Sequence, residues 1–105
     1  MASVRNEGTE LLVRALLSLE SEEECRNLLE DLLTTREMLD LSQRMLVASL
    51  LEEKLVYSEI ARRTGASSAT ISRVNRALHY GADGYRAVLP RLREEGKEGE
   101  RHDQL

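Results

Sequence analysis

The feature that most constrains the fold is a glycine near the middle of residues 57–78, YSEIARRTGASSATISRVNRAL. If Gly65 lies in a turn between two short helices, Ala61 comes one helical turn earlier, where only a small side chain lets two helices cross closely. Gly65 itself can take the left-handed conformation that a Cβ disfavours. Ser67 is a favourable N-cap for the second helix. The spacing therefore predicts a helix-turn-helix over about 57–78.

The two predicted helices have few apolar residues, and these fall at inward-facing positions. The inward positions hold Ile60, Thr64, Ala66, Ile71 and Val74. The outward positions of the second helix hold Ser68, Ala69, Thr70, Ser72, Arg73 and Arg76. So few apolar residues are enough to hold the two helices because the pair can pack on a scaffold of earlier helices. An ordinary hairpin of two helices, used only for packing, is the alternative interpretation.

The segments before this pair are rich in leucine at helical spacing, which predicts three more helices. They run from Glu7 to Leu19, from about Ser21 to Leu33 and from about Thr35 to Glu53. Two of the starts are indicated by capping boxes, Ser21 with Glu24 and Thr34 with Glu37. The chain has three tyrosines, no Phe, no Trp and no alternating β-branched run, so we expect an all-α fold.

The apolar surface of these N-terminal helices is larger than a chain of 105 residues is expected to cover alone. We therefore expect a homodimer with dimerising helices at about 7–53, and a monomer is the alternative. A last helix is expected at about 84–93, after a turn at 81–84. Residues 94–105 have almost no apolar side chain and are predicted to form a disordered charged tail, which leaves one domain over 1–93.

The net charge of −4 conceals two regions of opposite charge. Residues 7–40 contain ten acidic residues and three arginines, a balance of −7, whereas residues 57–93 contain seven arginines and two acidic residues, a balance of +5. Attraction of a polyanion depends on the local field, which salt screens within about 10 Å. The second region is therefore compatible with nucleic-acid binding, although charge alone also fits an ordinary solvated surface.

Other features of the sequence exclude several classes of function. The single Cys25 cannot form an internal disulfide and has no nearby partner for a metal, so we expect a cytoplasmic protein without a metal site. No stretch approaches about 18 consecutive apolar residues, so no membrane partner is expected. No catalytic Ser/His/Asp set, phosphate-binding glycine loop or paired carboxylates are present, so we expect no enzymatic activity.

A helix-turn-helix predicts a partner, double-stranded DNA, whose major groove takes the first turn of the second helix. Ser68 or Thr70 can hydrogen-bond a base, and a methyl group of Ala69 or Thr70 can meet a thymine methyl. Arg73 reaches a base or a phosphate, and the other arginines hold phosphates, which fix the register without reading sequence. The candidate DNA-binding residues are Ser67, Ser68, Ala69, Thr70, Arg73, Arg76, Arg62 and Arg63.

From about Leu17 to Leu92 the chain resembles the Trp repressor superfamily, and especially its branch of YerC/YecD-type Trp-repressor-related proteins. The most specific matches are Leu33-Thr34, Arg44, GASSATISR at 65–73 and the following VNRALHYGADGY. The resemblance implies a fold of six helices whose N-terminal helices interlock with those of a second subunit. It also implies a transcriptional regulator of the repressor type, with two helix-turn-helix heads on successive major grooves of a near-palindromic operator.

In the Trp repressor, tryptophan binds as corepressor at positions that correspond here to Arg44, Arg73 and Thr34. The repressor has a glycine directly after the recognition-helix arginine and a serine three residues later, where this chain has Val74 and Ala77. A valine narrows a slot that must take an indole ring, and Ala77 has no hydroxyl for the ammonium group. The resemblance thus implies tryptophan or another amino-acid-type corepressor, and Val74 and Ala77 disfavour tryptophan itself.

A second class of function stays open from the residues alone. The helical pair can also serve as a protein-interaction module without specific DNA binding, with an acidic N-terminal surface. Salt dependence separates the two classes, because phosphate contacts weaken steeply as ionic strength rises.

Overall fold

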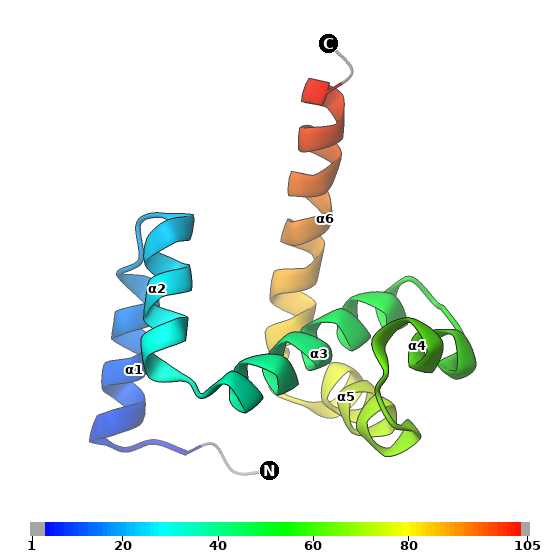
Figure 1. Ribbon diagram of the computed structural model, residues 1–105, viewed down its shortest axis with the longest axis horizontal. Helices are drawn as coiled ribbons and strands as arrows, with labels where there is room; N and C mark the ends of the chain where they lie inside the picture. Colours follow the sequence, from blue (N-terminus) through cyan, green and yellow to red (C-terminus); the bar gives the residue numbers. More distant parts are fainter. Residues whose placement is uncertain (1–3, 104–105) are drawn as a thin grey trace. The chain divides into compact units, whose positions relative to one another are not determined.

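A computed structural model describes residues 4–103, with side chains described for residues 4–95. Within this range the chain forms helices and no strand, which confirms the predicted all-α class. The helices are α1 (Glu7–Leu17), α2 (Glu22–Leu32), α3 (Thr35–Glu52), α4 (Tyr57–Thr64), α5 (Ser68–Tyr80) and α6 (Gly84–Asp103), as Figure 1 shows. Contacts within the chain divide it into two compact units, Met1–Leu41 and Ser42–Leu105, which are described separately below.

The first unit contains α1, α2 and the start of α3, and its chain reverses direction between α1 and α2 (Figure 1). The predicted capping box before α3 is present: Thr34 Oγ1 accepts from Glu37 N at 3.1 Å, and Glu37 Oε1 accepts from Thr34 N at 2.9 Å. Ser21 caps α2 by accepting from Glu24 N at 3.0 Å. The Glu24 carboxylate, however, accepts from Glu20 N rather than Ser21 N, so only half of that predicted box forms.

The first unit leaves its apolar residues largely exposed. Neither α1 nor α2 contains a buried residue. The side chain of Leu17 is 81% exposed, and other large apolar side chains of the unit are exposed by roughly half, among them Leu11, Val13, Leu16, Leu32 and Leu39. These helices therefore do not form a closed core within one chain.

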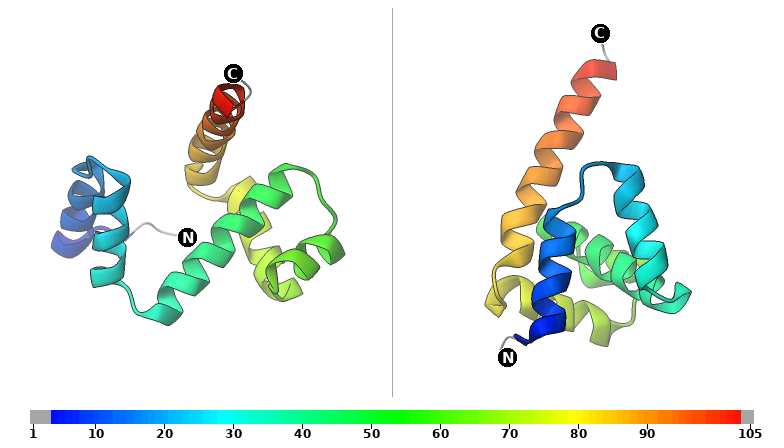
Figure 2. Two further views of the ribbon diagram at one scale, coloured as in Figure 1. Left: turned by 45° about the horizontal axis from the view of Figure 1, so that its top comes forward. Right: turned by 90° about the vertical axis from the view of Figure 1, so that its left-hand side faces the viewer.

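The second unit has the buried core of the described chain. Its buried residues come from α3, α4, α5, α6 and the turn after α4, namely Val47, Ala48, Leu50, Ile60, Ala66, Ile71, Val74, Leu78 and Leu89. Helix α4 contacts α5, and α5 contacts α6. Figure 2 shows α4 and α5 beside the last turns of α3 from two further directions. We expected the earlier helices to form the scaffold of the helical pair, but within one chain only the C-terminal half of α3 does so, together with the first turns of the later helix α6.

Polar contacts between helices fix the arrangement within this unit. Gln43 Nε2 on α3 donates to the carbonyl of Thr64 at the end of α4 at 3.2 Å. Arg86 on α6 donates to the carbonyls of Leu78 and His79 at the end of α5, at 3.0 and 3.2 Å. An ion pair of 2.7 Å joins Arg93 on α6 to Glu52 on α3. The C-terminal end of α4 and the C-terminal end of α5 are therefore each tied to a neighbouring helix.

The last helix is longer than the sequence predicted. We expected it to end near residue 93 and expected residues 94–105 to be a disordered tail, but α6 continues to Asp103. Glutamate, lysine and arginine, which dominate this segment, have high intrinsic helix propensity even where they bury no apolar surface. Residues 104–105 lie outside the described part of the chain, as do the side chains of residues 96–103.

Candidate nucleic-acid interface

The turn between α4 and α5 has the geometry that its sequence predicted. Gly65 has φ 73° and ψ 5°, which is the left-handed region, and its N–H donates to Ala61 O at 2.9 Å. Thr64 Oγ1 donates to the carbonyl of Ile60 at 2.7 Å and accepts from Ala66 N at 3.1 Å. Ala66 is buried in the core. The turn is thus closed by its own backbone and by one hydroxyl, and it determines where α5 begins.

The first turn of α5 is capped by Ser67, whose Oγ accepts from Thr70 N at 3.1 Å. The Ser67 hydroxyl also donates to Thr70 Oγ1 at 3.1 Å. The proton of the Ser67 hydroxyl and one of its two acceptor sites are therefore used locally, in capping α5. The Thr70 hydroxyl accepts the bond from Ser67 and keeps its own proton, which can be donated to an acceptor outside the chain.

Helix α5 separates its residues cleanly into two faces. Ile71, Val74 and Leu78 are buried in the core. Ser68, Ala69, Arg73 and Arg76 are exposed, and Thr70 is half-buried. Five of the eight candidate DNA-binding residues therefore lie on α5 away from its three buried residues, whereas Arg62 and Arg63 lie on α4 and Ser67 precedes α5 as its N-cap.

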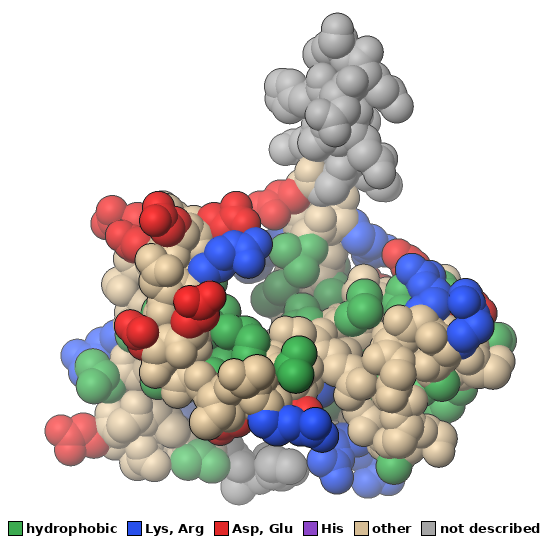
Figure 3. All heavy atoms as spheres, in the orientation of Figure 1, with side chains coloured by type: hydrophobic (Ala, Val, Ile, Leu, Met, Phe, Trp, Pro, Cys, Tyr) green, Lys and Arg blue, Asp and Glu red, His purple; other side chains and the backbone are tan. Residues whose placement is uncertain are grey.

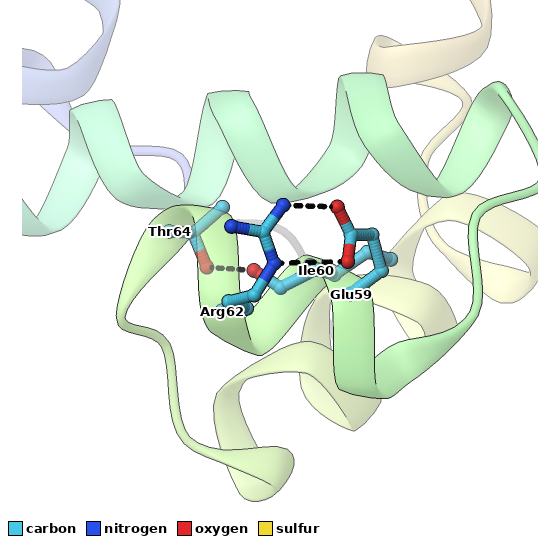
Figure 4. A network of polar contacts seen from close by, with 4 residues as sticks. All are labelled: Glu59, Ile60, Arg62 and Thr64. Atoms are coloured by element: carbon cyan, nitrogen blue, oxygen red, sulfur yellow. Dashed lines mark hydrogen bonds and ion pairs between the residues drawn. The ribbon is translucent and has the colours of Figure 1, made fainter.

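The arginines of α4 and α5 differ in whether they have an acidic partner. Arg62 on α4 forms a bidentate ion pair with Glu59, in which Nε donates to Oε2 at 3.0 Å and Nη2 donates to Oε1 (Figure 4). The hydrogen bond from Arg62 holds the pKa of the Glu59 carboxyl below its ordinary value, and burial opposes this shift. Within residues 4–95, Arg63, Arg73 and Arg76 make no ion pair.

The surface charges follow the two regions seen in the sequence. In Figure 3 acidic side chains gather over α2, whereas basic side chains are visible on the surface formed by α3, α4 and α5. The acidic first turn of α2 contains Glu22, Glu23 and Glu24. The second unit is thus the part of the chain suited to a polyanionic partner.

Comparison with known proteins extends over most of the chain. A model of the family described as Trp repressor protein matches residues 7–93. The chain belongs to the Trp repressor family. It is 44% identical over 91 residues to YerC of Bacillus subtilis (strain 168), a match that covers 87% of this chain and 88% of that protein. The resemblance to the YerC-type branch of the Trp repressor family is therefore confirmed.

Solved structures of Trp repressor family members share the fold. A TrpR-like protein from Eubacterium eligens ATCC 27750 is 50% identical with a TM-score of 0.80, over 84% of this chain and 91% of that one. A candidate Trp repressor from Staphylococcus aureus is 42% identical with a TM-score of 0.80, over 85% and 89% of the two chains. The six-helix Trp-repressor-like fold is thus confirmed, and the family favours a DNA-binding regulator over an enzyme.

The structure places the predicted effector residues in different parts of the chain. Thr34 belongs to the first unit, where its hydroxyl caps α3, and Arg44 and Arg73 belong to the second unit, where both are exposed. Thr34 lines a hollow of about 360 Å³. In the second unit a hollow of about 390 Å³ has almost purely apolar walls, and neither arginine lines it; its walls are Met45, Ala77, Ala82, Gly84, Tyr85 and Val88.

The sequence interpretation missed the role of Glu59. It treated Arg62 as a free phosphate contact, although the spacing of Glu59 and Arg62, three residues apart on a helix, is typical of an ion pair. It also did not foresee the contacts of Gln43 and Arg86, because those join segments distant in sequence.

In the described part of the chain no group of three or more His, Cys, Asp or Glu side chains could hold a metal ion, and no described helix is long and apolar enough to cross a bilayer.

Proposed function

We propose that this protein is a dimeric, sequence-specific DNA-binding regulator of the repressor type, acting in the cytoplasm, with α4 and α5 as its helix-turn-helix. The observation that carries the proposal is the division of α5 into two faces. Its buried residues anchor it in the second unit, while the small or basic residues of its first turns are exposed. This arrangement lets one helix enter a major groove without disturbing the core that holds it.

The exposed residues divide into two chemical roles. Ser68, Ala69 and Thr70 have short side chains, so the backbone of α5 can approach base edges closely, and the free hydroxyl proton of Thr70 suits an acceptor on a base. Arg73 lies one turn further and can reach a base or a phosphate. Arg63 and Arg76 supply phosphate contacts, which position the helix and carry most of the salt-dependent affinity.

The homodimer is part of this proposal, and the first unit supports it. Its exposed leucines are too many for a unit in contact only with water, and a second copy of the same chain is the partner that covers them. In a two-fold dimer the single domain expected over 1–93 is completed by the partner chain. Two copies of α5 then face successive major grooves, so the proposed operator is near-palindromic.

We do not propose tryptophan as the effector. Val74, which stands where the Trp repressor has a glycine, is only 2% exposed and fills core volume beside Arg73. Ala77 has no hydroxyl and lies on the wall of the apolar hollow instead. A site for a zwitterionic amino acid needs polar groups at both ends, and this hollow has apolar walls.

The test uses the full chain and compares a double variant with a matched control. Thr70→Ala with Arg73→Ala removes the two proposed reading groups of α5, and Arg91→Ala removes an exposed arginine on α6 that makes no ion pair among residues 4–95. We expect the double variant to lose specific binding of a selected duplex by roughly 100-fold, at about 1–3 kcal/mol for each base contact. Fluorescence anisotropy measures binding, and far-UV circular dichroism checks the helical content.

Two results would contradict the proposal. One is a double variant that binds the selected duplex as tightly as the parent. The other is a parent protein whose retention on duplex DNA does not fall as salt is raised, because phosphate contacts require that fall. If the protein does not bind DNA but binds a protein partner, that result would instead support the protein-interaction module.

A further inference from the structure

Arg62 on α4, which the sequence predicts to contact the DNA backbone, is already paired with Glu59. Figure 4 shows the Glu59 carboxylate and the Arg62 guanidinium side by side along α4, joined by two hydrogen bonds. Nε–H and one Nη2–H of Arg62 are both directed at this carboxylate. The fork geometry matches a carboxylate and a phosphate equally well, so Glu59 stands where a phosphate oxygen pair would bind.

The pair lies at the edge of the proposed interface. Arg62 and Arg63 occupy the last turn of α4, directly before the turn that leads into α5. The Arg62 side chain is 70% exposed and the Glu59 side chain 38% exposed, so the pair is open to solvent and to a polyanion. An exposed ion pair of this kind contributes little to stability, which leaves its effect on the surface charge as its main consequence.

From this arrangement we infer that Glu59 is an intramolecular mimic of DNA phosphate that cancels Arg62 and limits the electrostatic affinity of the helix-turn-helix for DNA. The inference rests on the proposed function and deepens it. A phosphate that approaches Arg62 must displace a carboxylate already bound bidentately, so no net charge is gained there. Arg63, Arg73 and Arg76, which make no ion pair among residues 4–95, carry the phosphate contacts instead.

The expected consequence is a lower affinity for DNA of any sequence. A phosphate contact adds affinity for every DNA sequence alike, because phosphates carry no base information. By cancelling one such contact, Glu59 lowers the affinity for random DNA and for an operator by the same factor. The protein therefore dissociates more readily from both kinds of DNA, and the ratio of the two affinities, which the base-reading groups of α5 set, is unchanged.

The test is a double-variant cycle on the full chain, with a random-sequence duplex of about 20 base pairs as the probe. Glu59→Gln should strengthen binding roughly 2- to 5-fold, which is the range of one exposed charge pair. It should also make the plot of log affinity against log salt steeper by about 0.9, which corresponds to one additional phosphate contact. In the Arg62→Gln background the same Glu59→Gln change should leave the salt slope unaltered.

A matched control separates contact from overall charge. Glu53, directly after α3 in the same unit, is an exposed carboxylate that makes no ion pair among residues 4–95, and Glu53→Gln makes the same change of charge. We expect it to leave the salt slope at the parent value. An equal steepening in Glu53→Gln, or an equal steepening by Glu59→Gln with and without Arg62, would overturn the inference, because overall charge would then explain it.

Two further outcomes are decisive. Weaker binding by Glu59→Gln would mean that Glu59 orients Arg62 for a phosphate, which overturns the proposed cancellation. If the parent binds the duplex and depends on Arg73 but the cycle shows no coupling, the inference fails and the proposed function survives. A parent without salt-dependent duplex binding overturns the proposed function and this inference together.

Discussion

At the scale of single residues, Gly65 ends α4 and Gly81 ends α5, and each position needs a glycine for a different physical reason. Gly65 has a φ of +73°, and a Cβ built on it would meet no atom within 4 Å. Its constraint is therefore purely conformational. A Cβ on Gly81 would lie 2.3 Å from the carbonyl oxygen of Ala77, so the constraint there is steric contact with backbone at the end of α5.

These two causes predict different costs of substitution. Gly65→Ala should lower the free energy of unfolding by about 1–2 kcal/mol, and Gly65→Asn by less, because asparagine tolerates the left-handed region. Gly81→Ala should cost roughly 3 kcal/mol, because the backbone of the last turn must shift to relieve the contact. Urea unfolding followed by circular dichroism measures all three. A Gly81→Ala variant that is more stable than Gly65→Ala would contradict the steric argument.

At the scale of helices, local signals are what the sequence predicts well. Three local features are confirmed: the left-handed turn at Gly65, the N-cap at Ser67 and the capping box of Thr34 with Glu37. Each of them depends on residues no more than four positions apart. The Gln43 and Arg86 contacts join different helices, so the one-dimensional pattern does not reveal them. The length of α6 was missed because a lack of apolar residues was weighed above the helix propensity of charged ones.

The cap of α3 makes a prediction about pH. Hydrogen bonds from the Thr34 backbone and then the Thr34 hydroxyl lower the pKa of the Glu37 carboxyl below its ordinary value of 4.5. A lowered pKa in the folded state means that Glu37 contributes its stability above pH 4.5 and loses it as pH falls through the lowered pKa. The stability difference between the parent and Glu37→Gln should therefore shrink on acidification from about pH 6 to about pH 3. A difference that stays constant over this range would contradict the assigned role of the carboxylate.

At the scale of the whole molecule, the exposed leucines of the first unit are the basis of the proposed homodimer. Leu11 is 59% exposed on α1, so replacing it should not disturb the single chain. If a second copy buries Leu11, Leu11→Glu removes about 1.5–3 kcal/mol of dimerisation free energy in each of the two subunits. The dissociation constant of the dimer then rises roughly 100-fold or more. Sedimentation velocity measures this change.

Val56 offers a control for the dimer prediction. It is 67% exposed in the second unit, so Val56→Ser removes exposed apolar surface outside the proposed dimer helices. We expect this variant to sediment like the parent. A parent chain that is monomeric at micromolar concentration, or a Leu11→Glu variant that dimerises as tightly as the parent, would contradict the proposed interface.

Selection of bound fragments from random duplex DNA shows whether the exposed first turns of α5 read DNA in a two-fold dimer. The parent protein should enrich two inverted half-sites with centres about 10 base pairs apart, one helical turn of DNA. The variant with Thr70→Ala and Arg73→Ala should enrich no such pair. Recovery of no motif by the parent, or of the same motif by both proteins, would contradict the assignment of α5 as the helix that reads DNA.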